Sequence, residues 1–121
     1  MKLRMQGNSL RLRLTQSEVE KVRDKGEVSE TVKFRSGGTF MYRLQTCVGG
    51  DLVQAVLAYG LISISVSTAM AERWATSEEV GIYGQDGELR ISVEKDFRCL
   101  TRASDEQETD AYPHPAEQCS P

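Results

Sequence analysis

The segment from Glu94 to Pro115, EKDFRCLTRASDEQETDAYPHP, holds the residues of this 121-residue chain whose types could do chemistry. It contains Cys99, a run of carboxylates and the single histidine, His114, and Cys119 follows shortly after. A thiolate beside an imidazole can act as a nucleophile. Two cysteines, a histidine and a carboxylate such as Asp110 also match the ligand types that zinc prefers.

The spacing of these residues favours neither chemistry. Cys99 and His114 are far apart in the sequence, and the distance from His114 to Cys119 matches no short knuckle in which a tight turn presets adjacent ligands. Pro113 and Pro115 flank the histidine, which favours an extended backbone and an exposed ring. We therefore expect no catalytic residue, metal or cofactor here. An enzyme or metal-binding protein with a site around Cys99 and His114 stays open as an alternative.

A second candidate site is a group of arginines near the start of the chain. In the stretch LRLRL, leucines alternate with Arg11 and Arg13, and Arg4 likewise stands between two hydrophobic residues, Leu3 and Met5. If the leucines point inward, these arginines share the outer face of one hairpin. Guanidinium groups bind carboxylates and phosphates in a forked geometry. Because aromatic side chains for base stacking are lacking in this stretch, weak nucleic-acid binding through the hairpin is only an alternative.

The charges of the chain are unevenly distributed. The net charge is −3, yet residues 1–50 carry ten Lys and Arg against five Asp and Glu, and residues 51–121 carry five against thirteen. The two parts therefore differ in sign, +5 against −8, which allows attraction between them or binding of an anionic partner. Hydrophobic residues make up 39% of the chain, and its apolar runs are too short for a membrane span. Three cysteines without a CxxC pair fit a reducing compartment, so we expect a cytoplasmic protein that does not bind membranes.

An internal repeat organises the hydrophobic residues. A shift of 52 positions superimposes the alternating run Leu10 to Leu14 on the run Ile62 to Val66. The same shift aligns further apolar positions, Val19 with Ala71, Val22 with Trp74 and Val28 with Val80, and a shift of 49 aligns Phe40, Tyr42 and Leu44 with Leu89, Ile91 and Val93. Such self-similarity predicts two copies of one structural unit.

Each copy has the pattern strand, strand, short helix, strand, strand. The alternating runs predict strands with one buried face. Thr15 and Glu18 fit a capping box at the start of the first helix, and Gly26 is expected to end that helix. Asp86-Gly87 predicts a hairpin turn, after which the last strand is expected to run to about Leu100. Trp74 is expected to be the largest side chain of the core.

These observations predict an α+β fold with a duplicated strand-strand-helix-strand-strand unit and pseudo-two-fold symmetry. We expect an antiparallel sheet or small barrel with two short helices. Residues 1–102 should form one domain made of two repeats, 1–50 and 51–100. Residues 103–121 carry five Asp and Glu and no Lys or Arg, which predicts an acidic extended tail that is ordered only by docking. Within it, the stretch from Tyr112 to Pro115 is expected to be an extended anchor.

Several stretches resemble a family of short bacterial proteins that is known only as a domain of unknown function. They are NSLRLRLTQSEVEKV (8–22), ERWATSEEVGI (72–82), ISVEKDFRCL (91–100) and DAYPHP (110–115). The resemblance implies a bacterial, cytoplasmic, single-domain protein and brings no activity or site residue.

We therefore predict a binding or regulatory module without catalytic activity. It would bind a protein partner or a second copy of itself, and nucleic acid is not the expected partner. Its candidate binding residues are Arg4, Arg11, Arg13, Tyr112 and His114.

Overall fold

The computed structural model describes residues 1–50, 52–97 and 112, which contain two helices and eight strands. The helices are α1 (Gln16–Lys25) and α2 (Thr68–Thr76), and neither of these two is long or apolar enough to cross a membrane. The strands are β1 (Lys2–Gln6), β2 (Ser9–Leu14), β3 (Glu27–Lys33), β4 (Thr39–Cys47), β5 (Val53–Ala58), β6 (Leu61–Ser67), β7 (Gly81–Asp86) and β8 (Leu89–Lys95). The α+β class is as predicted.

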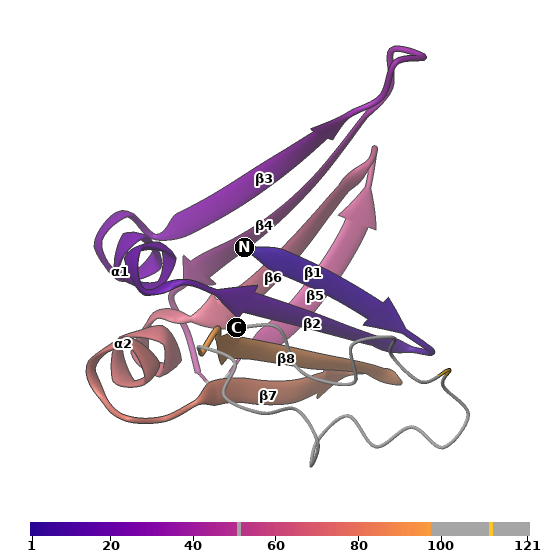
Figure 1. The fold of residues 1–121 in the computed structure, drawn as a ribbon. Coiled ribbons are helices and arrows are strands. Elements are labelled where there is room, and N and C mark those ends of the chain that lie inside the picture. Colours follow the sequence, from indigo (N-terminus) through magenta and orange to yellow (C-terminus); the bar gives the residue numbers. More distant parts are fainter. Residues whose placement is uncertain (51, 98–111, 113–121) are drawn as a thin grey trace.

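The strands form two four-stranded sheets with the same layout. Sheet A has the order β1-β2-β8-β7, and sheet B has the order β3-β4-β6-β5. In Figure 1, α1 and α2 lie together at one end of the sheets, and the turns between paired strands lie at the opposite end. One hydrophobic core draws side chains from both sheets and both helices.

Each sheet combines one hairpin from each of the two sequence copies. The first unit is β1-β2-α1-β3-β4 and the second is β5-β6-α2-β7-β8, so each sheet takes one hairpin from each unit. Strands within a hairpin are antiparallel, whereas the strands that join the two units, β2 with β8 and β4 with β6, are parallel. The sheets are therefore mixed and open, and differ from the antiparallel sheet or closed barrel that we expected. Local turn signals determine only the pairing inside each hairpin, so the parallel contact has no local signature.

The alternating runs of β2 and β6 supply six of the fifteen buried hydrophobic residues in the described part of the chain. The inward residues of β2 and β6 are buried, and Trp74 of α2 is completely buried. The Trp74 indole Nε1–H donates to the Val80 carbonyl at 3.0 Å, which satisfies its polar edge. The prediction that Trp74 is a core residue is confirmed.

The helix ends follow the sequence signals. The Thr15 backbone N–H donates to the Glu18 carboxylate at 2.9 Å, as a capping box requires. Gly26 ends α1 in the left-handed conformation with φ of 88°. In the second unit, the Ser67 hydroxyl accepts from the Met70 N–H at 3.2 Å. Both helices are short, with ten residues in α1 and nine in α2.

One detail of the repeat differs from the sequence alignment. Val28 of β3 is buried opposite Leu44, and the residue in the same position of the second unit is Ile82, which is buried opposite Val93. Val80 was expected there, but it precedes β7 and is 48% exposed.

The end of the last strand also differs from the prediction. β8 ends at Lys95, and neither Asp96 nor Phe97 belongs to a strand. The rest of the expected extension to Leu100 lies outside the described residues.

Candidate functional site

The outer face of sheet A carries a concentration of positive charge. Leu10, Leu12 and Leu14 of β2 point into the core, so the intervening Ser9, Arg11 and Arg13 point outward. Side chains of directly paired residues lie on the same face of a sheet, so the strand registers identify the rest of the surface. Its cationic residues, called the basic face below, are Lys2, Arg4, Arg11, Arg13 and Arg90.

The registers arrange this surface as three rows across the four strands. The row nearest the helices is Lys2, Arg13, Glu94 and Gly81, the middle row is Arg4, Arg11, Ser92 and Tyr83, and the third is Gln6, Ser9, Arg90 and Gln85. Among these paired positions, Glu94 is the only carboxylate. The basic face is therefore built by both units, because β1 and β2 come from the first and β7 and β8 from the second.

Glu94 is the electrostatic centre of the surface. The Nε atoms of Arg11 and Arg13 each lie 3.6 Å from Glu94 Oε1, and the Tyr83 hydroxyl donates to Glu94 Oε2 at 2.9 Å. Burial raises the pKa of Tyr83 above 10.0, and its hydrogen bond to the Glu94 carboxylate adds to this effect. One carboxylate thus holds two guanidinium groups and a phenol in fixed positions.

The same rows place like charges directly opposite one another. Lys2 pairs with Arg13, and Arg4 pairs with Arg11, on neighbouring antiparallel strands. Like charges in such cross-strand pairs are destabilising. Lys2 has a compensating contact, since its Nζ lies 3.1 Å from a carboxylate oxygen of Asp96. Arg11 and Arg13 are likewise compensated in part by Glu94.

Sheet B shows that the fold itself does not require a basic face. The positions of its outer face that correspond to the three rows are Gln54, Ser65, Gln45 and Glu27, then Val56, Ser63, Arg43 and Ser29, then Ala58, Leu61, Met41 and Thr31. One arginine and one glutamate among them balance, with an Arg43–Glu27 distance of 4.0 Å. Two faces of the same architecture therefore differ in charge, and only sheet A is strongly basic.

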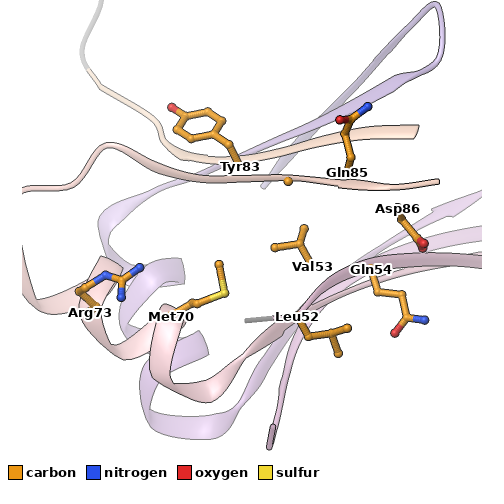
Figure 2. A pocket seen from close by; sticks show the side chains of 9 residues that line it. Leu52, Val53, Gln54, Met70, Arg73, Tyr83, Gln85 and Asp86 are labelled. Carbon is orange, nitrogen blue, oxygen red and sulfur yellow. The ribbon is translucent and has the colours of Figure 1, made fainter. Parts of the chain in front are cut away.

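A hollow of about 530 Å³ adjoins the basic face at the β7 edge of sheet A. In Figure 2, Tyr83 and Gln85 project from β7, Arg73 and Met70 come from α2, and Val53 lies between them. The Arg73 guanidinium is paired with Glu79 at 3.0 Å, with both side chains largely exposed. Such exposed pairs contribute only about 0–1 kcal/mol, so Arg73 can exchange Glu79 for a ligand carboxylate at little cost.

The structure brings some of the predicted site residues together. Arg4, Arg11 and Arg13 lie on one face, as the alternation predicted. Tyr112 is outside helices and strands and is 97% exposed.

The remaining candidates lie outside the described residues. They are His114, Cys99, Cys119, Asp110 and the other tail carboxylates. Within the described ranges, no three His, Cys, Asp or Glu side chains are grouped so that they could hold a metal ion.

Sequence reasoning missed Arg90, Glu94 and Tyr83. They belong to the site because β8 pairs in parallel with β2, a contact between two units that local patterns do not indicate. The signal that could have found Arg90 and Glu94 is the alternation in LRISVEK (89–95). There, Arg90, Ser92 and Glu94 have the opposite parity to the buried Ile91 and Val93.

Comparison with known proteins places the chain in a family without assigning it an activity. A family model described as "Family of unknown function (DUF7009)" matches residues 1–116. No curated protein and no solved structure matches the chain. The match extends over both units of the fold. The chain belongs to this family of unknown function, DUF7009.

Proposed function

We propose that this protein is a cytoplasmic binding module without catalytic activity, and that its basic face binds acidic polypeptide segments. The observation that carries the proposal is the excess of five cations over one carboxylate on the outer face of sheet A. Arginine forms the strongest hydrogen bonds to carboxylates when it binds them in the bidentate mode. The cytoplasmic location is inferred from the three cysteines of the chain. They form no CxxC pair, and this cysteine usage fits a reducing compartment.

A carboxylate ligand fits the surface better than a nucleic acid. Glu94 is paired with both Arg11 and Arg13 and would repel a continuous phosphate backbone that approached these two arginines. The single aromatic side chain in the rows, Tyr83, is tied to Glu94 by its hydroxyl. A polypeptide can place its carboxylates on either side of Glu94, because its charges are discrete and separated by neutral residues.

The tail provides an acidic segment within the same chain. Residues 1–102 contain fifteen Lys and Arg and thirteen Asp and Glu, a net charge of +2, whereas residues 103–121 contribute −5. The tail follows β8, a central strand of sheet A, and its first acid is ten residues beyond Lys95. Ten residues reach up to about 33 Å, so the tail carboxylates can reach the whole face and compete with a partner for it.

A peptide binding assay tests the proposal on the full-length chain. The probe is a fluorescently labelled peptide with the sequence of residues 103–121, and the receptor has Asp105, Glu106, Glu108, Asp110 and Glu117 changed to their amides. We expect binding that weakens with salt, because the contacts are between exposed charges. Changing Arg11 and Arg13 to Gln should weaken binding at least about tenfold, or about 1.4 kcal/mol.

The control is Arg43→Gln on the outer face of sheet B, which removes a charge from the opposite side of the molecule. It should leave peptide affinity unchanged. The proposal is wrong if the peptide does not bind, or if Arg43→Gln weakens binding as much as the sheet A changes. If a single-stranded oligonucleotide of equal charge bound more tightly than the peptide, the ligand of the basic face would be a nucleic acid and not a polypeptide.

A further inference from the structure

The end of the molecule opposite the helices carries a group of exposed hydrophobic side chains. This hairpin end is formed by the four connections between paired strands, at residues 7–8, 34–38, 59–60 and 87–88. Large hydrophobic side chains near it are 41% to 106% exposed, namely Met5, Val32, Phe34, Val56, Leu57 and Tyr59. Contiguous exposed apolar patches of several hundred Å² commonly mark interaction sites.

Several of these residues belong to the inner faces of the sheets. Met5 pairs with the buried Leu10 and Leu57 pairs with the buried Ile62, so both point toward the core side of their sheets. In Figure 1, β1 of sheet A and β3 of sheet B diverge from the helix end toward the hairpin end. The inner faces thus extend beyond the point where the opposite sheet can cover them.

We propose that two copies of this chain associate through their hairpin ends as a two-fold symmetric dimer. Val56 lies on the outer face of sheet B, and the exposed fractions of the other five side chains correspond to several hundred Å² per copy, given that an aromatic side chain alone buries about 150–250 Å². A specific interface buries about 800 Å² per partner. The apolar area at the hairpin end therefore supplies a large part of what a stable dimer needs.

The charges of the hairpin turns favour a second copy as the occupant. Lys33 and Arg35 lie at the β3-β4 connection, whereas Asp86 and Glu88 lie at the β7-β8 connection, the corresponding hairpin of the second unit. A two-fold dimer uses the same surface of both chains. If one turn of the first copy contacts a different turn of the second copy, the symmetry repeats that contact with the two copies interchanged. The basic turn of each copy can thereby face the acidic turn of the other.

The dimer leaves the basic face accessible. Its side chains point away from the core on the outer face of sheet A, whereas the interface uses the inner faces at the hairpin end. Each dimer would then present two basic faces, which raises the avidity for partners with repeated acidic segments. The association itself does not depend on the function proposed for that face.

Analytical ultracentrifugation of the full-length chain over a range of micromolar concentrations tests the association. We expect a reversible monomer-dimer equilibrium. Leu57→Asp and Phe34→Asp should each weaken it at least about tenfold, because each buries a charge in an apolar interface. Val48→Asp is the matched control, since Val48 is 95% exposed on the connection between β4 and β5 at the helix end, and it should leave the equilibrium unchanged.

Charge exchange distinguishes this geometry from non-specific hydrophobic association. A variant with Lys33→Glu and Arg35→Glu, and a separate Glu88→Lys variant, should each dimerise more weakly than the wild type. An equimolar mixture should recover more dimer than either variant alone, as a heterodimer. One turn contact of this heterodimer is unchanged from the wild type, and in the other the lysine at position 88 faces the two glutamates at positions 33 and 35. Circular dichroism checks that each variant keeps its fold. A wild type that stays monomeric at all concentrations, or a mixture that recovers no dimer, would overturn the proposal.

Discussion

Gly84 of β7 and Val53 of β5 touch where the edges of the two sheets cross, and a Cβ at position 84 would lie 2.8 Å from the Val53 Cβ. The Ala55 N–H donates to Asp86 at 3.2 Å across the same crossing. Gly84→Ala should therefore lower the free energy of unfolding by about 1–3 kcal/mol, because overpacking forces the strands apart. Urea denaturation measures the loss. Gly38→Ala is the control, because a Cβ there meets nothing within 4 Å, and an equal loss in both variants would contradict the argument.

Trp74 provides a spectroscopic test of the core without any substitution. It is the only tryptophan of the chain, and its side chain is completely buried. We expect native fluorescence that is blue-shifted and almost insensitive to iodide, since a charged quencher cannot enter a close-packed interior. Unfolding in urea should shift the emission to the red and make it quenchable. Strong iodide quenching of the native protein would show that the indole is accessible to solvent. That result would contradict the buried position of Trp74 in the core.

The contacts of Met1 with Glu18 and Glu30 predict how stability depends on pH. The Met1 amino group is paired with both carboxylates, at 3.0 Å for Glu30. Burial opposes the charge of Glu18, but the hydrogen bonds from the Met1 amine and Thr15 outweigh it and hold the pKa of Glu18 below 4.5. Burial likewise opposes the charge of the amine, but its hydrogen bonds to Glu18 and Glu30 hold its pKa above 8.0.

These two shifts act in opposite pH windows. The lowered pKa of Glu18 contributes stability that is present above pH 4.5 and is lost as the pH falls through the folded-state pKa. The raised pKa of the Met1 amine contributes stability that is present below pH 8.0 and is lost as the pH rises through its folded-state pKa. Glu18→Gln should flatten both limbs of the urea-denaturation stability profile, and Glu20→Gln on the exposed side of α1 should not. Identical profiles for the two variants would contradict this account.

Glu94→Gln tests the electrostatic centre of the basic face. Removal of the carboxylate should lower the pKa of Tyr83 toward 10.0, because the hydrogen bond and the negative charge both favour its neutral phenol form. NMR of the Tyr83 ring during an alkaline titration measures the change. The same variant should bind the labelled acidic peptide more tightly, since Arg11 and Arg13 lose their shared intramolecular partner. A Tyr83 pKa that does not move would mean that the hydrogen bond to Glu94 is absent in solution.

The sequence predicted the local structure well where one stretch carries its own signal. The alternation in β2 and β6 identified strands with one buried face, and Gly26 ended the first helix because only glycine enters the left-handed region at little cost. The outward position of Arg11 and Arg13 followed from the same alternation. The place of Ile82 was missed, because the link between α2 and β7 has a different length from its counterpart and the alignment by a fixed shift placed Val80 there.

The sequence by itself determined the elements, the repeat and the charge on one hairpin, because these depend on residues that are near one another in the chain. Only the tertiary structure decided that the two units exchange hairpins, that β8 lies parallel to β2, and that Arg90, Glu94 and Tyr83 join Arg4, Arg11 and Arg13 on one surface. The physical reason is that pairing between units is driven by burial of their shared hydrophobic faces. Burial is non-directional, so several pairings of the same two apolar faces satisfy the sequence pattern equally well.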